Sequence, residues 1–336
     1  MNSHHQFDLT DQLEDFDSLP SIRNVPEEHE IRYRRSKKHK NGNKQPADLM
    51  EKMAEEENEL EFSYSASKHE KAWLIDSLVD FYRQQWFDDI LTLIKGGGKE
   101  ASVYQCLGNQ TTGEKYIAAK VYRPRRFRQL RNDSLYREGR NNLDEDGHEL
   151  HDGRALRAIQ KRTSFGMHLM HTSWIEHEFQ TLTLLHNVGA DVPQPFICGN
   201  NAILMSYIGW DDLPAPTLNT VDLEPGEIHP VFDQVVHNID LMLENHRVHG
   251  DLSAYNILYF DGEIRLIDFP QVIDPDENRN AYAIFRRDIL RLCEYFQEQG
   301  LHCNPTRLAD DLWRKHGYSI RQTADPRLFA LEELDQ

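Results

Sequence analysis

One short segment restricts the possible folds of this chain more than any other: "VHGDLSAYNILYFDGEIRLIDF", Val248 to Phe269. Asp251 lies between an apolar helical run and a strand-like run, Asn256 comes five residues later, and Asp268 ends a second strand-like run. Three unrelated loop and cap residues could give this pattern. The spacing, the strand context and a lysine upstream would all have to coincide, so we interpret the three residues as one site.

The residue types of this site suit phosphoryl transfer. Asp251 and Asn256 have the spacing D-x-x-x-x-N, which is that of a kinase catalytic loop. The reaction needs a residue that orients or deprotonates the acceptor, together with oxygen ligands for Mg²⁺. Mg²⁺ prefers a few protein oxygens plus waters and phosphates. We therefore predict Asp251 as the catalytic base, and Asn256 and Asp268 as the metal ligands.

A glycine-rich stretch, "IKGGGKEASVY" from Ile94 to Tyr104, lies between two strand-like runs. Glycine lets backbone amides approach a phosphate closely and adopts dihedral angles that other residues avoid. Lys99 is followed by Glu100 instead of Ser or Thr, which excludes a Walker motif. The stretch fits a phosphate-binding loop, but a glycine-rich hairpin without a ligand is equally common.

A lysine, Lys120, stands inside the apolar strand "YIAAKVYR". Burying a lysine without a partner is costly. One interpretation is an edge lysine whose amine reaches solvent. The other is a lysine that holds nucleotide phosphates and pairs with a carboxylate on the neighbouring helix, where "WIEHEF" offers Glu176 and Glu178.

The order of the predicted elements indicates an α+β fold of two lobes, in which a small mixed sheet with one helix precedes a mostly helical half. We expect helices over residues 67–85, 170–188, 228–246, 279–299 and 305–316, and strands over 90–94, 101–107, 116–122, 196–198, 202–207, 257–260 and 264–267. Residues 1–66 have sparse apolar residues and are expected to be disordered. The long polar stretch 123–165 is expected to be a functional insertion or a partly ordered loop.

The charge balance and the cysteines narrow the class of protein. A net charge of −18 argues against general polyanion binding by the whole surface, but basic patches at Arg32–Lys44 and Arg123–Arg140 remain. The four cysteines form no CxxC pair, so we expect reduced thiols in an intracellular protein. Because no apolar run approaches the length of a membrane span, we expect a cytoplasmic protein without a membrane partner.

Several further motifs distinguish among the families of kinase-like phosphotransferases. They are "GKEASVY" (Gly98–Tyr104), "AAKVYR" (Ala118–Arg123), "WIEHEFQTLTLLHNVGADVPQP" (Trp174–Pro195), "DDLPAPTL" (Asp211–Leu218), "HGDLSAYNIL" (His249–Leu258) and "IDFPQ" (Ile267–Gln271). In combination they resemble the RIO family of atypical serine/threonine protein kinases. The resemblance runs from about Lys68 to Phe296 and is closest to the first RIO subfamily over most of the motifs.

This resemblance implies a bilobal, protein-kinase-like fold whose reduced helical lobe lacks the peptide-docking region. The sequence agrees, because no "APE" follows Asp268. The implied layout is a tail over residues 1–66, a kinase domain over 67–326 and a second tail over 327–336. The N-lobe would cover about 67–205, including a flexible insert at 123–165, and the C-lobe about 209–326.

The resemblance also implies the roles of individual residues. Lys120 would contact the phosphates, with Glu178 as its partner. These two residues and Asp251 would be the catalytic residues. Asn256 and Asp268 would hold the metal. "MSYI", Met205 to Ile208, would be gatekeeper and hinge. The implied cofactors are ATP and Mg²⁺, with Mn²⁺ as a substitute. The predicted cofactor-binding residues are Gly96, Gly97, Gly98, Lys99, Ser102, Val103, Lys120, Met205, Ser206, Ile208 and Asn256.

The activity implied is that of a serine/threonine kinase or ATPase in small-subunit ribosome maturation. It would transfer the γ-phosphate of ATP to a serine of a protein substrate or to its own Asp268. One alternative is a small-molecule phosphotransferase of the aminoglycoside or choline kinase type. A second alternative is a nucleotide-gated factor that binds a ribonucleoprotein. Its contact with ribosomal-precursor RNA or protein would be made by the basic runs Arg32–Lys44 and Arg123–Arg140.

Overall fold

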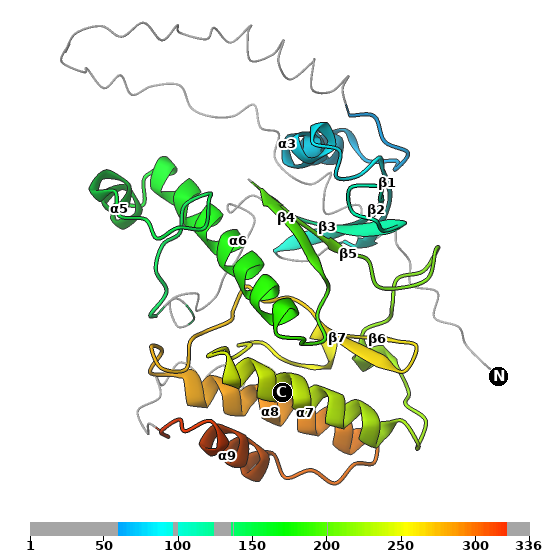
Figure 1. The fold of residues 1–336 in the computed structure, drawn as a ribbon, viewed down its shortest axis with the longest axis vertical. Coiled ribbons are helices and arrows are strands. Elements are labelled where there is room, and N and C mark those ends of the chain that lie inside the picture. Colours follow the sequence, from blue (N-terminus) through cyan, green and yellow to red (C-terminus); the bar gives the residue numbers. More distant parts are fainter. Residues whose placement is uncertain (1–59, 97–99, 124–135, 137, 200, 321–336) are drawn as a thin grey trace, which may run out of the picture.

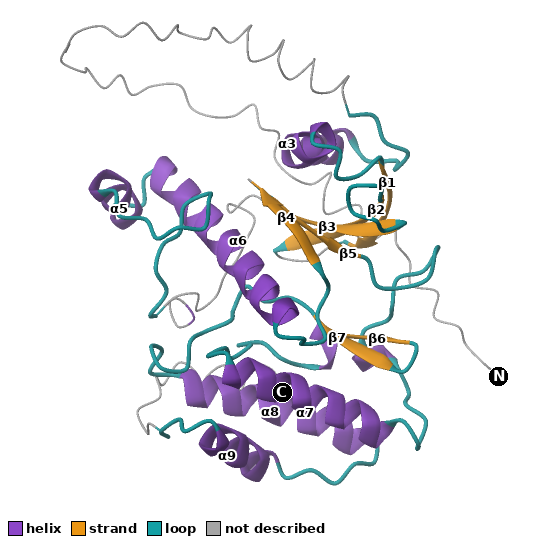
Figure 2. Cartoon of the chain, viewed as in Figure 1, coloured by secondary structure: helices purple, strands orange, loops and turns teal. Residues whose placement is uncertain are grey.

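The computed structural model describes residues 60–96, 100–123, 136, 138–199 and 201–320. Most of the predicted N-terminal tail, all of the C-terminal tail, the core of the glycine stretch and the first part of the predicted insert lie outside these residues. The described elements form an upper sheet layer and a lower helical layer, with one long helix beside the sheet (Figures 1 and 2). None of the helices in the described ranges is long and apolar enough to cross a bilayer.

A five-stranded antiparallel sheet forms the upper layer, with its strands in the order β1-β2-β3-β5-β4. Each neighbouring pair is antiparallel, which refines the expectation of a mixed sheet, and three of the pairs consist of strands that are consecutive in the sequence. The bounds are β1 Asp89–Lys95, β2 Ala101–Leu107, β3 Tyr116–Tyr122, β4 Pro195–Gly199 and β5 Ala202–Ser206.

The side chains of strand β3 alternate between the two faces of this sheet. Its Ile117, Ala119 and Val121 pack against helix α3 (Lys68–Arg83), which covers one face. Because successive side chains of a strand point to opposite faces, Lys120 projects from the other face. The alternation therefore explains how a lysine inside an apolar strand reaches the space between the two layers.

The structure corrects the predicted N-terminal boundary. Residues 60–66 were expected to belong to the disordered tail, but they pack beside the sheet. Leu60 is fully buried, and the backbone amide of Tyr64 donates to the carbonyl of Ile90 at 2.9 Å. The alternate apolar residues of "LEFSY" supply the burial that the rest of the segment lacks.

The long helix α6 (Ser164–Asn187) begins six residues before the predicted start, because Thr163 caps it by accepting from the amide of Gly166. A short helix that the sequence analysis missed, α5 (Gly153–Gln160), packs against α6. Residues 141–147 of the predicted insert lie along α6, where the amide of Leu143 donates to the hydroxyl of Ser173 at 2.9 Å.

The lower layer holds the larger core. Helices α7 (Ile228–Glu244), α8 (Ala281–Glu298) and α9 (Pro305–Lys315) pack together below a two-stranded hairpin (Figure 2). The hairpin consists of β6 (Ile257–Phe260) and β7 (Glu263–Leu266), paired in register from Ile257 with Leu266. Two short 3₁₀ helices, Leu218–Thr220 and Ala254–Asn256, complete the described elements.

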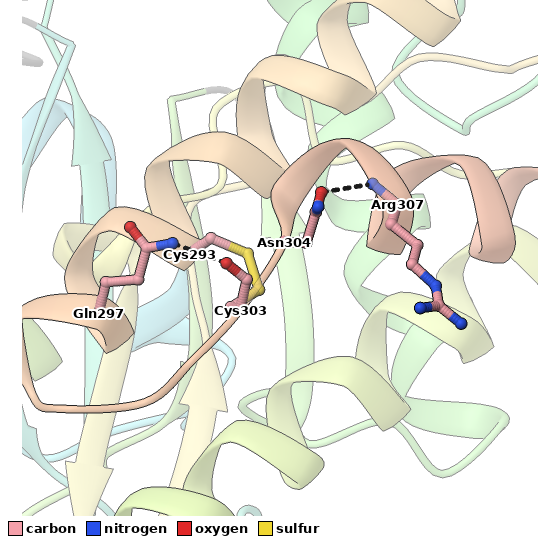
Figure 3. The surroundings of a disulfide bond; sticks show 5 residues. All are labelled: Cys293, Gln297, Cys303, Asn304 and Arg307. Carbon is pink, nitrogen blue, oxygen red and sulfur yellow. Dashed lines mark hydrogen bonds between the residues drawn. A yellow bond between two sulfur atoms is a disulfide. The ribbon is translucent and has the colours of Figure 1, made fainter.

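The cysteine prediction is wrong for one pair. Cys293 on α8 and Cys303 just before α9 form a disulfide, with their Cα atoms 5.8 Å apart (Figure 3). This separation lies in the range that a disulfide requires. The chain turns back after α8, and the side-chain Nε2 of Gln297 donates to the carbonyl of Cys303 at 2.7 Å. Cys106 and Cys198 are free thiols, as expected.

Candidate active site

A cavity of about 630 Å³ lies between the upper sheet and the lower layer. Its lining includes side chains from β3, from α6 and from the segment that follows β7, so it joins parts of the chain that are far apart in the sequence. Such a volume suits a ligand of the size of a nucleotide. Lys120, Glu178, Asp251 and Asp268 all line this cavity.

The buried ammonium of Lys120 binds two carboxylates. It forms an ion pair with Glu178 of α6 and another with Oδ1 of Asp268 at 2.6 Å. Lys120 is only 8% exposed and Glu178 only 3%. The hydroxyl of Tyr122 also donates to Oε2 of Glu178 at 2.7 Å, which fixes that carboxylate from a second side. Of the two glutamates offered by the sequence, the structure thus brings Glu178 to the lysine, while Glu176 contacts Gln180.

The charges of this cluster stabilise one another. Burial alone works against the ammonium, but the carboxylates of Asp268 and Glu178 outweigh it and raise the pKa of Lys120. Burial likewise opposes ionisation of Asp268, yet Lys120 lowers the pKa of Asp268 below its usual range. Both groups are therefore charged at neutral pH. Asp268 also has a φ of +72°, a left-handed conformation that is uncommon for residues other than glycine.

Asp251 and Asn256 lie on one loop, as their spacing predicts. The amide Nδ2 of Asn256 donates to the backbone carbonyl of Asp251 at 2.8 Å and approaches Oδ2 of the same residue at 3.5 Å. Burial and the nearby Asp288 carboxylate raise the pKa of Asp251, and Arg291 opposes this shift. The side chain of Asp251 remains 41% exposed and lines the cavity.

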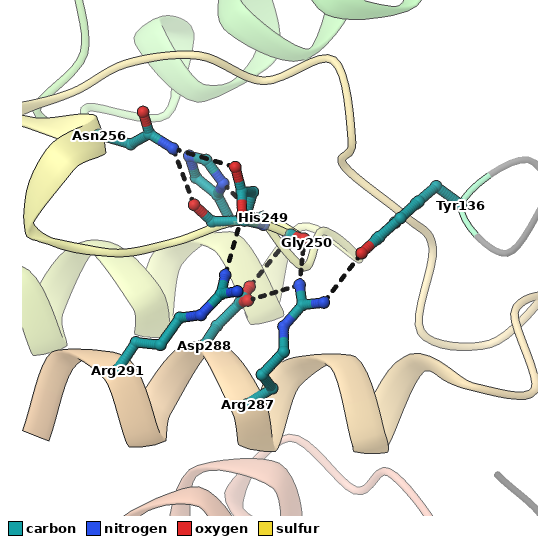
Figure 4. Close-up of polar contacts among 8 residues, drawn as sticks. Tyr136, His249, Gly250, Asn256, Arg287, Asp288 and Arg291 are labelled. Carbon is teal, nitrogen blue, oxygen red and sulfur yellow. Dashed lines mark hydrogen bonds and ion pairs between the residues drawn. The ribbon is translucent and has the colours of Figure 1, made fainter. Parts of the chain in front are cut away.

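Helix α8 supports this loop from below (Figure 4). Oδ2 of Asp288 accepts from the amide of Gly250 at 2.9 Å, and the guanidinium of Arg287 donates to the carbonyl of Gly250 at 2.5 Å. One turn further along α8, Nη1 of Arg291 donates to Oδ1 of Asp251 at 2.9 Å. Three side chains of one helix therefore hold two consecutive loop residues.

The predicted hinge forms the apolar end of the cavity. Met205, Ser206 and Ile208 line it, together with Tyr207. The amide of Ser206 donates to the carbonyl of Gln194 at 2.8 Å. The carbonyl of Ile208 accepts from the amide of Ala215 at 3.0 Å. The segment is thus fixed on both sides.

Not every predicted cofactor-binding residue reaches the cavity. Val103 of β2 lines it, but the neighbouring Ser102 is buried on the opposite face of that strand, towards Tyr104 and α3. Gly96 follows Lys95, which lines the cavity. The other three predicted residues of the phosphate loop lie outside the described residues: Gly97, Gly98 and Lys99.

Some cavity residues were missed by the sequence analysis. Lys95 at the end of β1 and Glu100 at the start of β2 flank the glycine stretch, and both line the cavity. Tyr255, 66% exposed, lies in the loop between Asp251 and Asn256 and also lines it. The position of Lys95 and Glu100 beside the glycines was a signal that could have identified them. Nothing local marks Arg291, which is distant in sequence from Asp251.

Comparisons with known proteins add an independent finding. Residues 102–308 match the family described as the RIO domain. The chain is 33% identical over 142 residues to the RIO-type serine/threonine-protein kinase Rio1 of Thermoplasma acidophilum, covering 42% of this chain and 73% of that protein. It is 31% identical over 209 residues to Rio1 of Haloferax volcanii, covering 60% of this chain and 62% of that protein.

A comparison of structures agrees with these matches. The crystal structure of the Rio2 kinase from Chaetomium thermophilum superposes with a TM-score of 0.51. The superposition covers 80% of this chain and 76% of that chain, at 17% sequence identity. At this identity the likeness concerns the fold, and it confirms the predicted bilobal, kinase-like architecture.

Proposed function

Because this chain belongs to the RIO family of atypical serine/threonine protein kinases, we propose that it transfers the γ-phosphate of ATP in the cavity between its two layers. Family membership confirms the prediction made from the motifs. The assignment of roles to individual residues is our proposal, and it rests on their geometry.

One observation carries the proposal. Lys120, Glu178, Asp251 and Asp268 come from four separate parts of the chain, yet they line a single cavity. Asn256 joins them through its bonds to Asp251. A cation for phosphates, its carboxylate partner, a base and two oxygen ligands are the groups that phosphoryl transfer requires. An unrelated pocket would have no reason to collect the four side chains that line this one, and Asn256, which is not among the lining residues, is held beside them by Asp251.

The shape of the cavity indicates how a nucleotide would be oriented. Its apolar end at the hinge would take the adenine ring, with the Ser206 carbonyl and the Ile208 amide as hydrogen-bonding partners. Its charged end, at Lys120 and Asp268, would take the phosphates. The backbone contacts of the hinge are already formed, so little rearrangement is needed there, whereas Lys120 would exchange its ion pair with Asp268 for the phosphates.

The donor set also fits a magnesium ion. Asp268 supplies a carboxylate and Asn256 an amide oxygen, and Mg²⁺ prefers oxygen ligands of this kind alongside phosphates and waters. We propose these two residues as its protein ligands. A bound magnesium ion would neutralise charge on the phosphate oxygens. The Lys120 ammonium, held by Glu178, would stabilise charge on the phosphates as well.

Asp251 would act on the acceptor hydroxyl. Its carboxylate would orient the hydroxyl and take its proton while the acceptor oxygen forms a bond to the γ-phosphorus. The bond between that phosphorus and the β–γ bridging oxygen breaks, and ADP leaves with the bonding electrons. The partial exposure of Asp251 at the cavity is the feature that would let an acceptor approach.

Two acceptors fit this geometry. A serine or threonine hydroxyl of a protein could approach Asp251 from solvent. The carboxylate of Asp268 itself is a second acceptor, because its side chain is 34% exposed and lines the same cavity. Transfer to Asp268 would give an acyl phosphate, whereas transfer to serine would give a phosphate ester.

The experiment that tests the proposal is intact-mass analysis after incubation with ATP and Mg²⁺, followed by acid and hydroxylamine treatment. We expect one added phosphate on the protein, together with release of ADP. Loss of that phosphate in hydroxylamine would identify the acyl phosphate, and retention would identify a serine or threonine ester. If a folded, nucleotide-binding protein neither gained a phosphate nor released ADP, the proposed function would be wrong.

We also propose that the basic runs Arg32–Lys44 and Arg123–Arg140 contact ribosomal-precursor RNA. The abundance of Arg and Lys in these runs supports the idea, although most of these residues lie outside the described part of the structure. Phosphate contacts would make the affinity fall steeply as salt rises. Filter binding of structured RNA between about 50 and 200 mM salt should show roughly a tenfold or larger loss. A flat dependence of the affinity on salt, or no binding at low salt, would contradict this RNA contact.

A cytoplasmic location stays a prediction.

A further inference from the structure

We propose that Arg291 is a positioning residue for phosphoryl transfer, which holds the carboxylate of Asp251 in the orientation that the reaction needs. The inference rests on the proposed function and adds to it a residue of α8 that no catalytic motif contains. The observation behind it is the ion pair between Nη1 of Arg291 and Oδ1 of Asp251, at 2.9 Å. Figure 4 shows Arg291 reaching up from α8 towards the loop that carries Asn256.

The contacts around Asp251 leave its two carboxylate oxygens in different situations. Oδ1 is engaged by Arg291, while the backbone carbonyl is engaged by Asn256 at 2.8 Å. Oδ2 has only a long approach, 3.5 Å, to the same Asn256 amide. A carboxylate fixed through one oxygen keeps the lone pairs of the other for the acceptor hydroxyl. Arg291 would therefore set the side-chain torsion of Asp251 without occupying the oxygen that reacts.

The backbone beneath this carboxylate is already fixed by other residues. Asp288 binds the amide of Gly250, and Arg287 binds its carbonyl. Arg287 is further held by the hydroxyl of Tyr136 at 2.9 Å. The loop backbone thus has its own supports on α8. Replacing Arg291 should leave the path of the loop unchanged and release only the side chain of Asp251.

Charge supplies the second argument. Asp251 and Asp288 are two carboxylates near one another, and Arg287 and Arg291 are the two guanidinium groups paired with them. The four formal charges sum to zero. A carboxylate withdrawn from water needs a partner, and a planar guanidinium makes a directed hydrogen bond that the ammonium of lysine, which keeps the charge, copies only in part. Arg291 is therefore suited both to balance Asp251 and to orient it.

The test compares Arg291→Gln and Arg291→Lys with the wild-type chain. For Arg291→Gln we expect kcat for phosphoryl transfer to fall about 10- to 100-fold, a part of the 10²–10⁴ that a positioned base contributes. The dissociation constant for the magnesium–ADP complex, measured by calorimetry, should stay within about twofold, because Arg291 is proposed to act through Asp251, which acts on the acceptor and not on the nucleotide. Arg291→Lys should keep more activity than Arg291→Gln. An equal loss in both, or a loss of nucleotide affinity, would contradict positioning.

A matched control lies on the same helix. Arg286 is an exposed arginine of α8, and Arg286→Gln removes the same charge without touching the loop. It should retain wild-type kcat and melting temperature. If Arg286→Gln lowers kcat as much as Arg291→Gln does, the effect is one of net charge and the inference is wrong.

A double-mutant cycle gives the decisive readout. If Arg291 acts only through Asp251, then Arg291→Gln should cause little further loss in an Asp251→Asn background, so the two effects are strongly non-additive. Additive losses would overturn the inference, as would wild-type or increased kcat in Arg291→Gln. Should Arg291→Gln fail to fold, the same cycle is run with Arg291→Lys. A folded wild-type protein with no phosphoryl transfer would instead overturn the proposed function itself, so the two failures are distinguishable.

Discussion

Replacing Asp251 by Asn should lower kcat for phosphoryl transfer by about 10²–10⁴-fold, which is the usual contribution of a positioned acid or base. The amide has the size of the carboxylate and leaves the bond between Asn256 and the backbone carbonyl of residue 251 in place. It cannot accept the acceptor's proton. Nucleotide affinity should change by no more than about threefold, because Asp251 is proposed to act on the acceptor and not on the phosphates.

The measurement is single-turnover release of ADP together with calorimetric binding of ADP and Mg²⁺. Asp233→Asn is the matched control, because Asp233 is an exposed aspartate of α7 and is not among the residues that line the cavity. The control should behave as wild type. Turnover by Asp251→Asn within about threefold of wild type would mean that another group deprotonates the acceptor, and it would remove Asp251 from the mechanism.

The second large effect is expected at Asp268. Asp268→Asn removes the carboxylate that we propose as a metal ligand, while the ion pair of Lys120 with Glu178 remains. Affinity for ADP in the presence of Mg²⁺ should fall by about 10- to 100-fold, the scale of loss on disturbing metal ligation. Affinity for ADP in EDTA should change far less. The difference between the two conditions is the quantity that identifies a metal ligand.

Calorimetric titration of ADP with Mg²⁺ and with EDTA checks this result. Asp261→Asn serves as the control, because Asp261 lies in the exposed turn of the β6–β7 hairpin with a φ of +53°, which asparagine adopts readily. The control should keep the full stimulation by Mg²⁺. If Asp268→Asn also keeps it, the metal is bound elsewhere and Asn256 loses its proposed role as well.

Local patterns predicted most of the elements correctly, because they depend on neighbours in the sequence. Strand β2 over Ala101–Leu107 and strand β3 over Tyr116–Tyr122 have the predicted bounds. The loop spacing of Asp251 and Asn256 was equally visible, since both groups lie on one short segment. Ser102 could have been excluded by the same logic, because strand alternation places it on the face opposite Val103.

The features that the sequence did not reveal depend on packing between distant segments. The pair of Asp251 and Arg291 exists only because α8 lies beneath the catalytic loop, and no periodicity encodes that placement. Cys293 and Cys303 meet because the chain reverses between α8 and α9. Helix α5 is short and lies inside the long polar stretch 123–165, which was interpreted as an insertion or loop, although Asp152 accepts from the amide of Arg154 as an N-cap.

The triad of Lys120, Glu178 and Asp268 also has a consequence for which form of the nucleotide the cleft selects. One ammonium faces two carboxylates, so the cluster carries a formal charge of −1 where the phosphates should arrive. A bare nucleotide polyanion is repelled by the uncompensated carboxylate, whereas a nucleotide already bound to a divalent cation offers that carboxylate a new counter-ion. Under the proposed roles, binding would exchange counter-ions: Asp268 would give up the ammonium, and Lys120 would turn to the phosphates. We expect wild-type affinity for ATP in EDTA to be weaker than affinity for the magnesium complex, and equal affinities by calorimetry would refute this selection.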